Sequence, residues 1–269
     1  MEKRLAILNF ISVILIIAVS YISQTGIING NTMGSLSAEY YNLFTPAGYA
    51  FAIWGIIFLW LLGFSGYQLF QAFSAKNDLK FLRNSGYWFL IANLANAGWV
   101  IAWLNEFTGL SVLLMFLIMF SLIKVILNTN MERWDAPLKI IAFSWWPICL
   151  YSGWIAVASI ANVSAYLSKI GWTAPFFGEE IWTVIIIAVA VFINIAIIWR
   201  RNMREFAAVG VWALIAIYFR HFGEIPLITY SALIGAVAIF SNIIYHGWMN
   251  KETNPMYKFL ESKTKSSSQ

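Results

Sequence analysis

Eight apolar runs constrain this chain more than any other feature. A helix needs about 17 to 25 residues to cross a hydrocarbon layer of ~30 Å, and the runs approach or exceed that length. In lipid, helices and closed barrels alone satisfy every backbone polar group, and these runs lack the alternation of barrel strands. The sequence therefore predicts an all-α integral membrane protein with about eight transmembrane helices. The predicted spans are residues 5–23, 48–73, 86–104, 108–128, 139–163, 180–200, 206–221 and 227–249. The run 206–221 is the weakest.

Charge supports this list of spans. Charged residues make up only 11% of the chain, against roughly 25% in an average soluble domain. With the N-terminus inside, all seventeen basic residues except Lys169 and Arg220 lie on inner segments, as the positive-inside rule requires. We therefore expect cytoplasmic N- and C-termini, in a bacterial inner membrane or an organelle membrane. The net charge of +5 then reflects topology, and we expect no nucleic-acid partner.

The first run has two interpretations. Lys3 and Arg4, an apolar stretch and Ala18-x-Ser20 are also the parts of a cleaved signal peptide. Cleavage of residues 1–23 would leave seven helices. We favour a retained helix because the apolar run continues into Tyr21 without a polar cleavage region.

Residues 24–47 form a long outer loop rich in Gly, Asn, Ser and Thr. A loop of this length between adjacent helices is either a functional lid over a binding site or a plain connector. The sequence does not distinguish the two.

Aromatic and amide side chains occur at unusual depth in three spans. Trp54 lies about 9 Å along its helix from Gly48, well below the usual interfacial belt of aromatic residues. Asn96 is expected to face the bundle, with an interhelical hydrogen bond favoured over a ligand contact. Trp103, seven residues further on, is expected in the interfacial belt.

The fifth span carries a regular polar and aromatic face. Tyr151, Trp154, Ala158 and Asn162 repeat at i, i+3, i+7 and i+11, while small residues between them allow close helix approach. Pro147 predicts a kink in the inner half of this span.

Three motifs in register resemble one family. Pro46-x-Gly48-x-x-Phe51-x-x-Trp54, Asn96-x-x-Trp99 and the face of the fifth span are similar in order and spacing to the translocator protein family, also called tryptophan-rich sensory proteins. The resemblance covers roughly residues 1–168. It implies a five-helix bundle with a pocket for tetrapyrroles, sterols or aromatic drugs, capped by the first loop. The ligand-binding residues it implies are Phe51, Trp54, Asn96, Trp99, Tyr151, Trp154, Ala158 and Asn162.

The chain departs from the family pattern in two places. Leu150 stands where the family has a proline. The chain also continues beyond the family's five helices, which predicts three parts: a translocator-like bundle (1–168), a three-helix membrane extension (169–249) and a polar cytoplasmic tail (250–269).

Depth also places these residues together. The second helix enters from outside and the third and fifth return there, so the unusual side chains of all three share one level beneath the outer loop. Such a lining suits a flat, apolar ligand with a few polar groups. The hypothesis is a membrane-embedded binder of a porphyrin-like ligand, acting as a sensor or as a facilitator of its movement. The alternatives are a structural or partner-binding protein whose rings only pack, and an enzyme that modifies a bound pigment.

The remaining features narrow the function. No ionisable residue lies near the middle of a span, which argues against an energised transporter, and no catalytic motif occurs. With one cysteine, Cys149, and two distant histidines, we expect no metal and no cofactor. Arg220, His221 and Glu224 are interpreted as a solvated helix end with a local ion pair, in preference to an anion or acid/base site. Two sterol-type patterns, Val163-x-x-Tyr166-x-x-Lys169 and Leu214-x-x-x-Tyr218-x-Arg220, keep a sterol ligand open, and self-association into a homo-oligomer also stays open.

Overall fold

The computed structural model describes residues 2–74, 79–172, 174 and 176–251. Within these ranges the chain is helical and contains no strand. The short elements are α2 (Met33–Glu39), the 3₁₀ helix η1 (Gly48–Ala52), α4 (Lys80–Ser85), α7 (Leu138–Ile140) and the π-helix η2 (Ile141–Trp145). The long helices are α1 (Glu2–Ile22), α3 (Ile53–Phe73), α5 (Trp88–Leu104), α6 (Thr108–Asn128), α8 (Trp146–Lys169), α9 (Gly178–Arg201), α10 (Arg204–His221) and α11 (Pro226–Met249).

The long helices follow the predicted apolar runs, and most of their ends differ from the prediction by only a few residues. Six helical segments in the described chain are long and apolar enough to cross a membrane. They are Glu2–Ile22, Gly48–Phe73, Thr108–Asn128, Leu138–Lys169, Gly178–Arg201 and Pro226–Met249. α5 has 17 residues, and α10 begins with Arg204 and Glu205. The prediction of an all-helical membrane protein is therefore confirmed, while the number of eight crossings stays a prediction.

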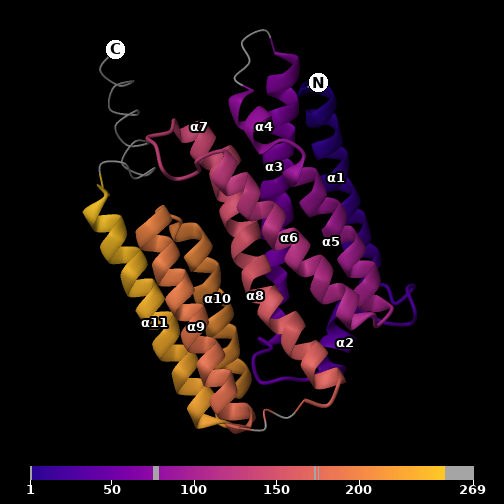
Figure 1. Cartoon of the computed structure of the whole chain (residues 1–269), viewed down its shortest axis with the longest axis vertical. Coiled ribbons are helices and arrows are strands. Elements are labelled where there is room, and N and C mark those ends of the chain that lie inside the picture. Colours follow the sequence, from indigo (N-terminus) through magenta and orange to yellow (C-terminus); the bar gives the residue numbers. More distant parts are fainter. Residues whose placement is uncertain (1, 75–78, 173, 175, 252–269) are drawn as a thin grey trace.

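The helices pack as two groups, visible side by side in Figure 1. In the first group α1 packs on α3 and α5, α5 on α6, and α8 on both α6 and α3. In the second group α11 packs on α9 and α10. The groups meet where α10 packs along α8 and contacts η1. The division at residue 168 remains a prediction from sequence, and residues 252–269 of the predicted tail lie outside the described residues.

Glycines set the distance between several helices. A Cβ atom on Gly153 of α8 would lie 2.8 Å from the Phe206 carbonyl oxygen of α10. A Cβ on Gly210 would meet the Asn194 side chain of α9 at 2.7 Å. The close approach that small residues predicted for the fifth span thus joins the two helix groups.

An irregular turn lies beside the predicted kink. Residues Ile141–Trp145 form the π-helical turn η2, directly before Pro147, which occupies the first turn of α8. A proline lacks the N–H that an unbroken helix requires, and a π turn is a common way of accommodating the change in hydrogen bonding. The irregularity therefore lies before Pro147, on the side that the sequence predicted.

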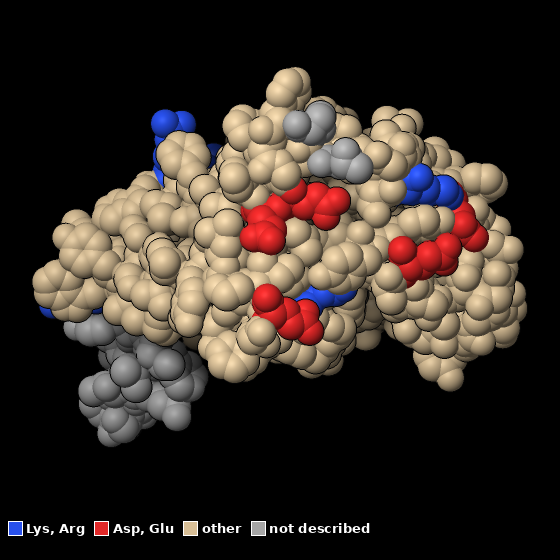
Figure 2. All heavy atoms as spheres, turned by 90° about the horizontal axis from the view of Figure 1, so that it is seen from below, with Lys and Arg blue, Asp and Glu red and all other residues tan. Residues whose placement is uncertain are grey.

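The two ends of the bundle differ. The N-terminus of α1 and the C-terminal end of α11 lie at the same end as α4 and α7, whereas α2 lies at the other, which we call the loop end. Figure 2 shows the loop end, where acidic side chains form several groups. Glu39, Glu106, Glu179, Glu180 and Glu224 lie in the turns and helix ends of this region. Lys169 and Arg220 are the basic side chains among the described residues at this end.

Candidate functional site

Part of the loop 24–47 is a short helix that covers the bundle. The α2 helix begins at Thr32, whose hydroxyl accepts from the Ser35 N–H (3.1 Å) while the Ser35 hydroxyl accepts from the Thr32 N–H (2.9 Å). This reciprocal capping satisfies donors that a helix start leaves unpaired, so a helix forms in an otherwise polar stretch. We call residues 31–47 the cap.

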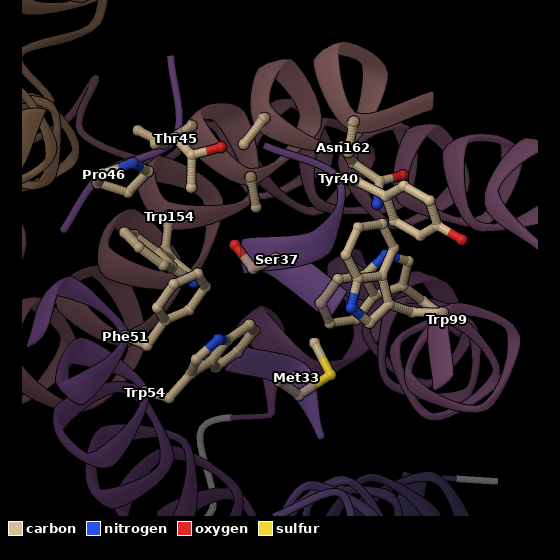
Figure 3. Close-up of a pocket in the computed structure, with 15 residues that line it drawn as sticks. Met33, Ser37, Tyr40, Thr45, Pro46, Phe51, Trp54, Trp99, Trp154 and Asn162 are labelled. Atoms are coloured by element: carbon tan, nitrogen blue, oxygen red, sulfur yellow. The ribbon is translucent and has the colours of Figure 1, made fainter. Parts of the chain in front are cut away.

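Beneath the cap lies a cavity of about 50 Å³, which we call the chamber. Figure 3 shows the rings of Phe51, Trp54, Trp99 and Trp154 around it, with Met33 and Ser37 of α2. η1, α3, α5 and α8 supply the rings, so three predicted spans converge on one space. Other lining residues are Tyr40, Thr45, Pro46, Trp103, Val157, Ala158, Ala161, Asn162 and Ala165.

The rings pack edge to face and still leave this space. Trp154 is only 2% exposed, and its ring centroid lies 6.5 Å from that of Trp54 and 5.9 Å from that of Phe51, at interplanar angles of 84° and 85°. On its other side Trp54 stacks on Phe58 at 5.1 Å. Edge-to-face pairs at these distances are favourable, so the wall on this side of the chamber is well packed and apolar.

A second, larger cavity continues from the chamber. It has a volume of about 680 Å³ and lies between the loop end of α1, the cap, α3 and α5, and we call it the groove. Chamber and groove share Met33, Ser37, Pro46, Phe51, Trp54 and Trp99 as lining residues. The two cavities are therefore adjacent, and the chamber is a narrow side space of the groove.

Six of the eight predicted ligand-binding residues line the chamber, and two do not. Phe51, Trp54, Trp99, Trp154, Ala158 and Asn162 contact the cavity. Asn96 and Tyr151 are buried and bonded to each other, with the Asn96 amide donating to the Tyr151 hydroxyl at 2.8 Å. This bond joins α5 to α8 and agrees with the interhelical role favoured for Asn96. Asn162 is also bonded across helices, because its Oδ1 accepts from the Ser111 hydroxyl of α6 at 3.0 Å.

Polar contacts fasten one side of the cap to the α5–α6 turn. The Tyr40 hydroxyl donates to Glu106 Oε2 at 2.7 Å, and the Lys169 ammonium lies 3.8 Å from the same oxygen. Burial and the neighbouring carboxylate raise the pKa of Tyr40 above its ordinary value, whereas the Tyr40 hydrogen bond lowers the pKa of Glu106. Glu106 is therefore ionised and Tyr40 neutral near pH 7, as this bond requires.

The other side of the cap is fastened by α10, which the sequence did not indicate. The Ala47 N–H donates to the Ala216 carbonyl (3.2 Å), and the Trp212 indole N–H donates to the Ala50 carbonyl (3.1 Å). One turn further on, Arg220 donates to the Pro46 carbonyl (3.2 Å) and His221 Nε2 lies 2.9 Å from the Leu43 carbonyl.

These contacts correct the interpretation of this helix end for Arg220 and His221, whereas Glu224 is exposed, as a solvated helix end requires. His221 is 0% exposed, and the ion pairs found in the described part of the chain do not include Arg220 or Glu224. Arg220 and His221 face the cap, because α10 packs along α8 and brings its last turn against residues 43–46.

Sequence reasoning missed other parts of the site. Trp103, expected in the interfacial belt, is 5% exposed; it lines the chamber and packs on Tyr40, with ring centroids 6.1 Å apart. Its spacing of seven residues from Asn96 placed it on the same helix face and was a usable signal. The contributions of Tyr40 and Pro46 depend on how the cap folds back, and no local pattern predicts that.

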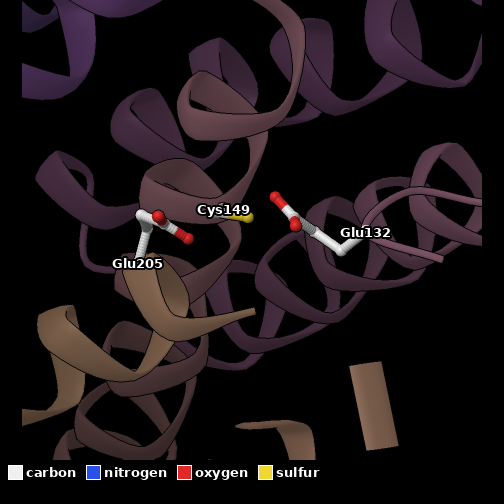
Figure 4. Close-up of side chains that lie close together, drawn as sticks. All are labelled: Glu132, Cys149 and Glu205. Carbon is white, nitrogen blue, oxygen red and sulfur yellow. The ribbon is translucent and has the colours of Figure 1, made fainter. Parts of the chain in front are cut away.

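A separate polar cluster lies at the opposite end of the bundle. Glu132 of the α6–α7 turn, Cys149 of α8 and Glu205 of α10 each bring an oxygen or sulfur atom within 4.8 Å of the others. Figure 4 shows the Glu132 carboxyl directed toward the Cys149 thiol. Burial and the neighbouring Glu205 raise the pKa of Glu132 to about 8, so this carboxyl is mostly protonated at neutral pH. These residue types can bind metals, and they lie too far apart in the sequence for a local pattern to group them.

Apolar helices around a capped cavity with an aromatic lining define a multi-pass integral membrane protein with a candidate ligand pocket. The family model described as TSPO-like protein matches residues 6–245, and the chain belongs to that family. The resemblance read from three motifs is thus confirmed, and the match runs on through α9, α10 and most of α11. Comparison with curated proteins and with solved structures found no match. Membership indicates, in general terms, a ligand-binding or sensing role in a membrane.

Proposed function

We propose that this protein binds a flat, hydrophobic aromatic ligand of the porphyrin type in the chamber and groove, as a sensor of that ligand or a facilitator of its movement. The observation that carries the proposal is the convergence of Phe51, Trp54, Trp99 and Trp154 around one cavity beneath the cap. Flat faces of large rings stack on indole faces, and exclusion of water from such a site favours apolar ligands.

The sizes of the two cavities indicate which part of the ligand each one holds. A space of about 50 Å³ holds only a few atoms, so the chamber takes one edge or a substituent of a macrocycle. The groove, at about 680 Å³, falls within the roughly 300 to 1,000 Å³ typical of pockets for drug-sized molecules. The body of the ligand therefore lies in the groove against Trp54 and Trp99, which line both spaces.

Unpaired donors favour a ligand with acceptor atoms. The indole N–H groups of Trp99, Trp103 and Trp154 have no hydrogen-bond acceptor among the described residues. A buried donor without a partner is unfavourable by about 1 to 3 kcal/mol. A carbonyl, an imine-type ring nitrogen or a carboxylate of a ligand that reaches these groups would remove that penalty.

A titration of the purified protein with protoporphyrin, followed by tryptophan fluorescence, tests the proposal. We expect saturable quenching in the wild type, and a rise in Kd of about tenfold, equivalent to ~1.4 kcal/mol, in Trp54→Leu and Trp154→Leu. Trp248→Leu is the matched control, because Trp248 is an exposed tryptophan near the end of α11, at the opposite end of the bundle. Its Kd should equal that of the wild type.

Two other outcomes identify the rival functions. Equal, non-saturable quenching in all four proteins would show that the pigment only partitions into the detergent or lipid, and the rings would then serve packing alone. A slow change in the absorption spectrum of the bound pigment, absent without protein, would indicate an enzyme that modifies it.

A further inference from the structure

One charged side chain lines the groove, and it comes from the C-terminal helices. Arg220 in the last turn of α10 contacts this cavity, whose other lining residues are apolar, glycine, serine or glutamine. The motifs that first indicated the family all lie before residue 168, so they gave no indication of this cation. Its position places a full positive charge on the wall of the same cavity that Trp54 and Trp99 line.

The contacts of Arg220 hold it in place without neutralising it. One Nη donates to the Pro46 carbonyl at 3.2 Å, and the guanidinium carbon lies 4.8 Å from the centroid of the Tyr41 ring. The ion pairs of the described chain are Arg83 with Glu2 and Lys169 with Glu106. Arg220 therefore has a carbonyl and a ring as partners, and no carboxylate among the described residues.

A guanidinium in this setting discriminates between ligands by charge. It carries five N–H donors in a planar fork that matches a carboxylate, and the Pro46 bond uses only part of that capacity. An apolar ligand that fills the groove removes water from Arg220 and offers its guanidinium no hydrogen-bond acceptor, so the binding of such a ligand is disfavoured. A ligand with an acidic group replaces that water with a charge-assisted hydrogen bond.

We propose that Arg220 recognises an acidic group of the ligand, so that the protein selects amphipathic aromatic acids: flat apolar ring systems with a carboxylate at one edge. This inference rests on the proposed function and names the chemical class of its ligand. The ring system lies against Trp54 and Trp99, and the carboxylate lies at the Arg220 side of the groove. The extension thereby supplies specificity to a pocket built mainly by α1, the cap, η1, α3, α5 and α8.

Protoporphyrin and its dimethyl ester form a matched pair of probes, because they share one ring system and only the first carries carboxylates. We expect the wild-type protein to bind the acid at least tenfold more tightly than the ester. Arg220→Gln should raise the Kd of the acid to that of the ester while leaving the ester's own Kd unchanged. Arg220→Lys should restore part of the preference, since it keeps the charge and loses the planar fork. Arg83→Gln, which removes an arginine at the opposite end of the bundle, is the control and should behave as wild type.

The outcomes separate this inference from the proposed function. Equal affinity of the wild type for acid and ester, with saturable binding that Trp54→Leu still weakens, would overturn the role of Arg220 and leave the aromatic pocket intact. Weakening of acid and ester to the same degree in Arg220→Gln would also overturn it, because Arg220 would then act only as a clamp on Pro46. If neither probe binds saturably, the proposed function itself fails. The comparison of acid and ester in the wild type needs no variant, so it stands even if Arg220→Gln folds poorly.

Discussion

The buried aromatic and polar side chains of this protein have two roles. Some line the cavity, and others join neighbouring helices. Trp54 and Trp154 line the chamber, whereas Asn96 and Tyr151, part of the same sequence motifs, bond to each other away from it. Both residues of this pair are buried, and an amide or hydroxyl without a partner is costly there. Motif position thus identified the right region, and local hydrogen bonding decided the role of each residue.

The Asn96–Tyr151 bond gives a prediction at this scale. Asn96→Leu leaves the buried Tyr151 hydroxyl without its donor, and we expect a loss of stability on the order of 1 kcal/mol, in line with interhelical hydrogen bonds in other membrane proteins. Tyr151→Phe in the same background removes the orphaned hydroxyl and should recover part of the loss. Thermal unfolding in detergent measures both variants.

The same variants report on the site. Neither residue lines the chamber, so Asn96→Leu should change the porphyrin Kd much less than Trp54→Leu does. A loss of binding as large as that of Trp54→Leu, at unchanged stability, would show that Asn96 contacts the ligand directly.

Among the elements, α8 contacts the site and the C-terminal helices at once, because one of its faces lines the chamber and another packs on α10. One face presents Trp154, Ala158 and Asn162 to the chamber, while Gly153 lies against α10. α10 in turn bonds to the cap at Ala47 and to η1 at Ala50. The contact between α8 and α10 therefore determines the position of the cap and also the distance between the two helix groups.

Substitution of Gly153 tests this contact. A methyl group there would lie 2.8 Å from a backbone oxygen of Phe206 and 3.1 Å from the Val209 Cβ, so the helices must move apart. We expect Gly153→Ala to lower the free energy of unfolding by about 1 to 3 kcal/mol, as overpacking does in other cores. Gly66→Ala is the matched control, since a Cβ at Gly66 of α3 has open space around it. That change should be neutral or slightly stabilising, because alanine favours helix more than glycine. Equal stability of the two variants would contradict the close contact.

For the whole molecule, the main prediction concerns how many helices cross the membrane. α5 and α10 have 17 and 18 residues, about 26 and 27 Å of helix, slightly less than a typical hydrocarbon layer. Both pack side by side with long apolar neighbours, α5 against α6 and α10 against α11. The positive-inside rule also favours crossing by both helices, because otherwise the basic turns would be divided between the two sides.

Labelling of single cysteines in a Cys149→Ala background tests these two helices. Asn84 and Phe107 lie before and after α5, and Arg200 and Glu224 lie on either side of α10. All four are exposed. With eight crossings and the N-terminus inside, an impermeant maleimide added to right-side-out vesicles should label Phe107→Cys and Glu224→Cys, and it should spare Asn84→Cys and Arg200→Cys. Labelling of Asn84→Cys together with Phe107→Cys would show that α5 does not cross.

Much of the fold was predictable because lipid restricts it so strongly. Apolar length alone located the long helices, and spacing within them placed Trp54, Trp99 and Trp154 on faces that meet. The bonded pair Asn96 and Tyr151 shows the limit of that approach, since one helix face can point toward a cavity or toward a neighbouring helix. The α2 helix was missed as well, although Thr32 and Ser35 have the spacing of a capping pair.

The sequence by itself determined the membrane class, the positions of the long helices and the family, because each of these depends on apolar length or on spacing within one helix. Tertiary structure alone decided that α10 fastens the cap, that Arg220 reaches the groove and that Glu132, Cys149 and Glu205 meet. These contacts join segments up to about 180 residues apart in the chain, as between Leu43 and His221. They depend on how whole helices pack, and the periodicity of one segment carries no information about its distance from another.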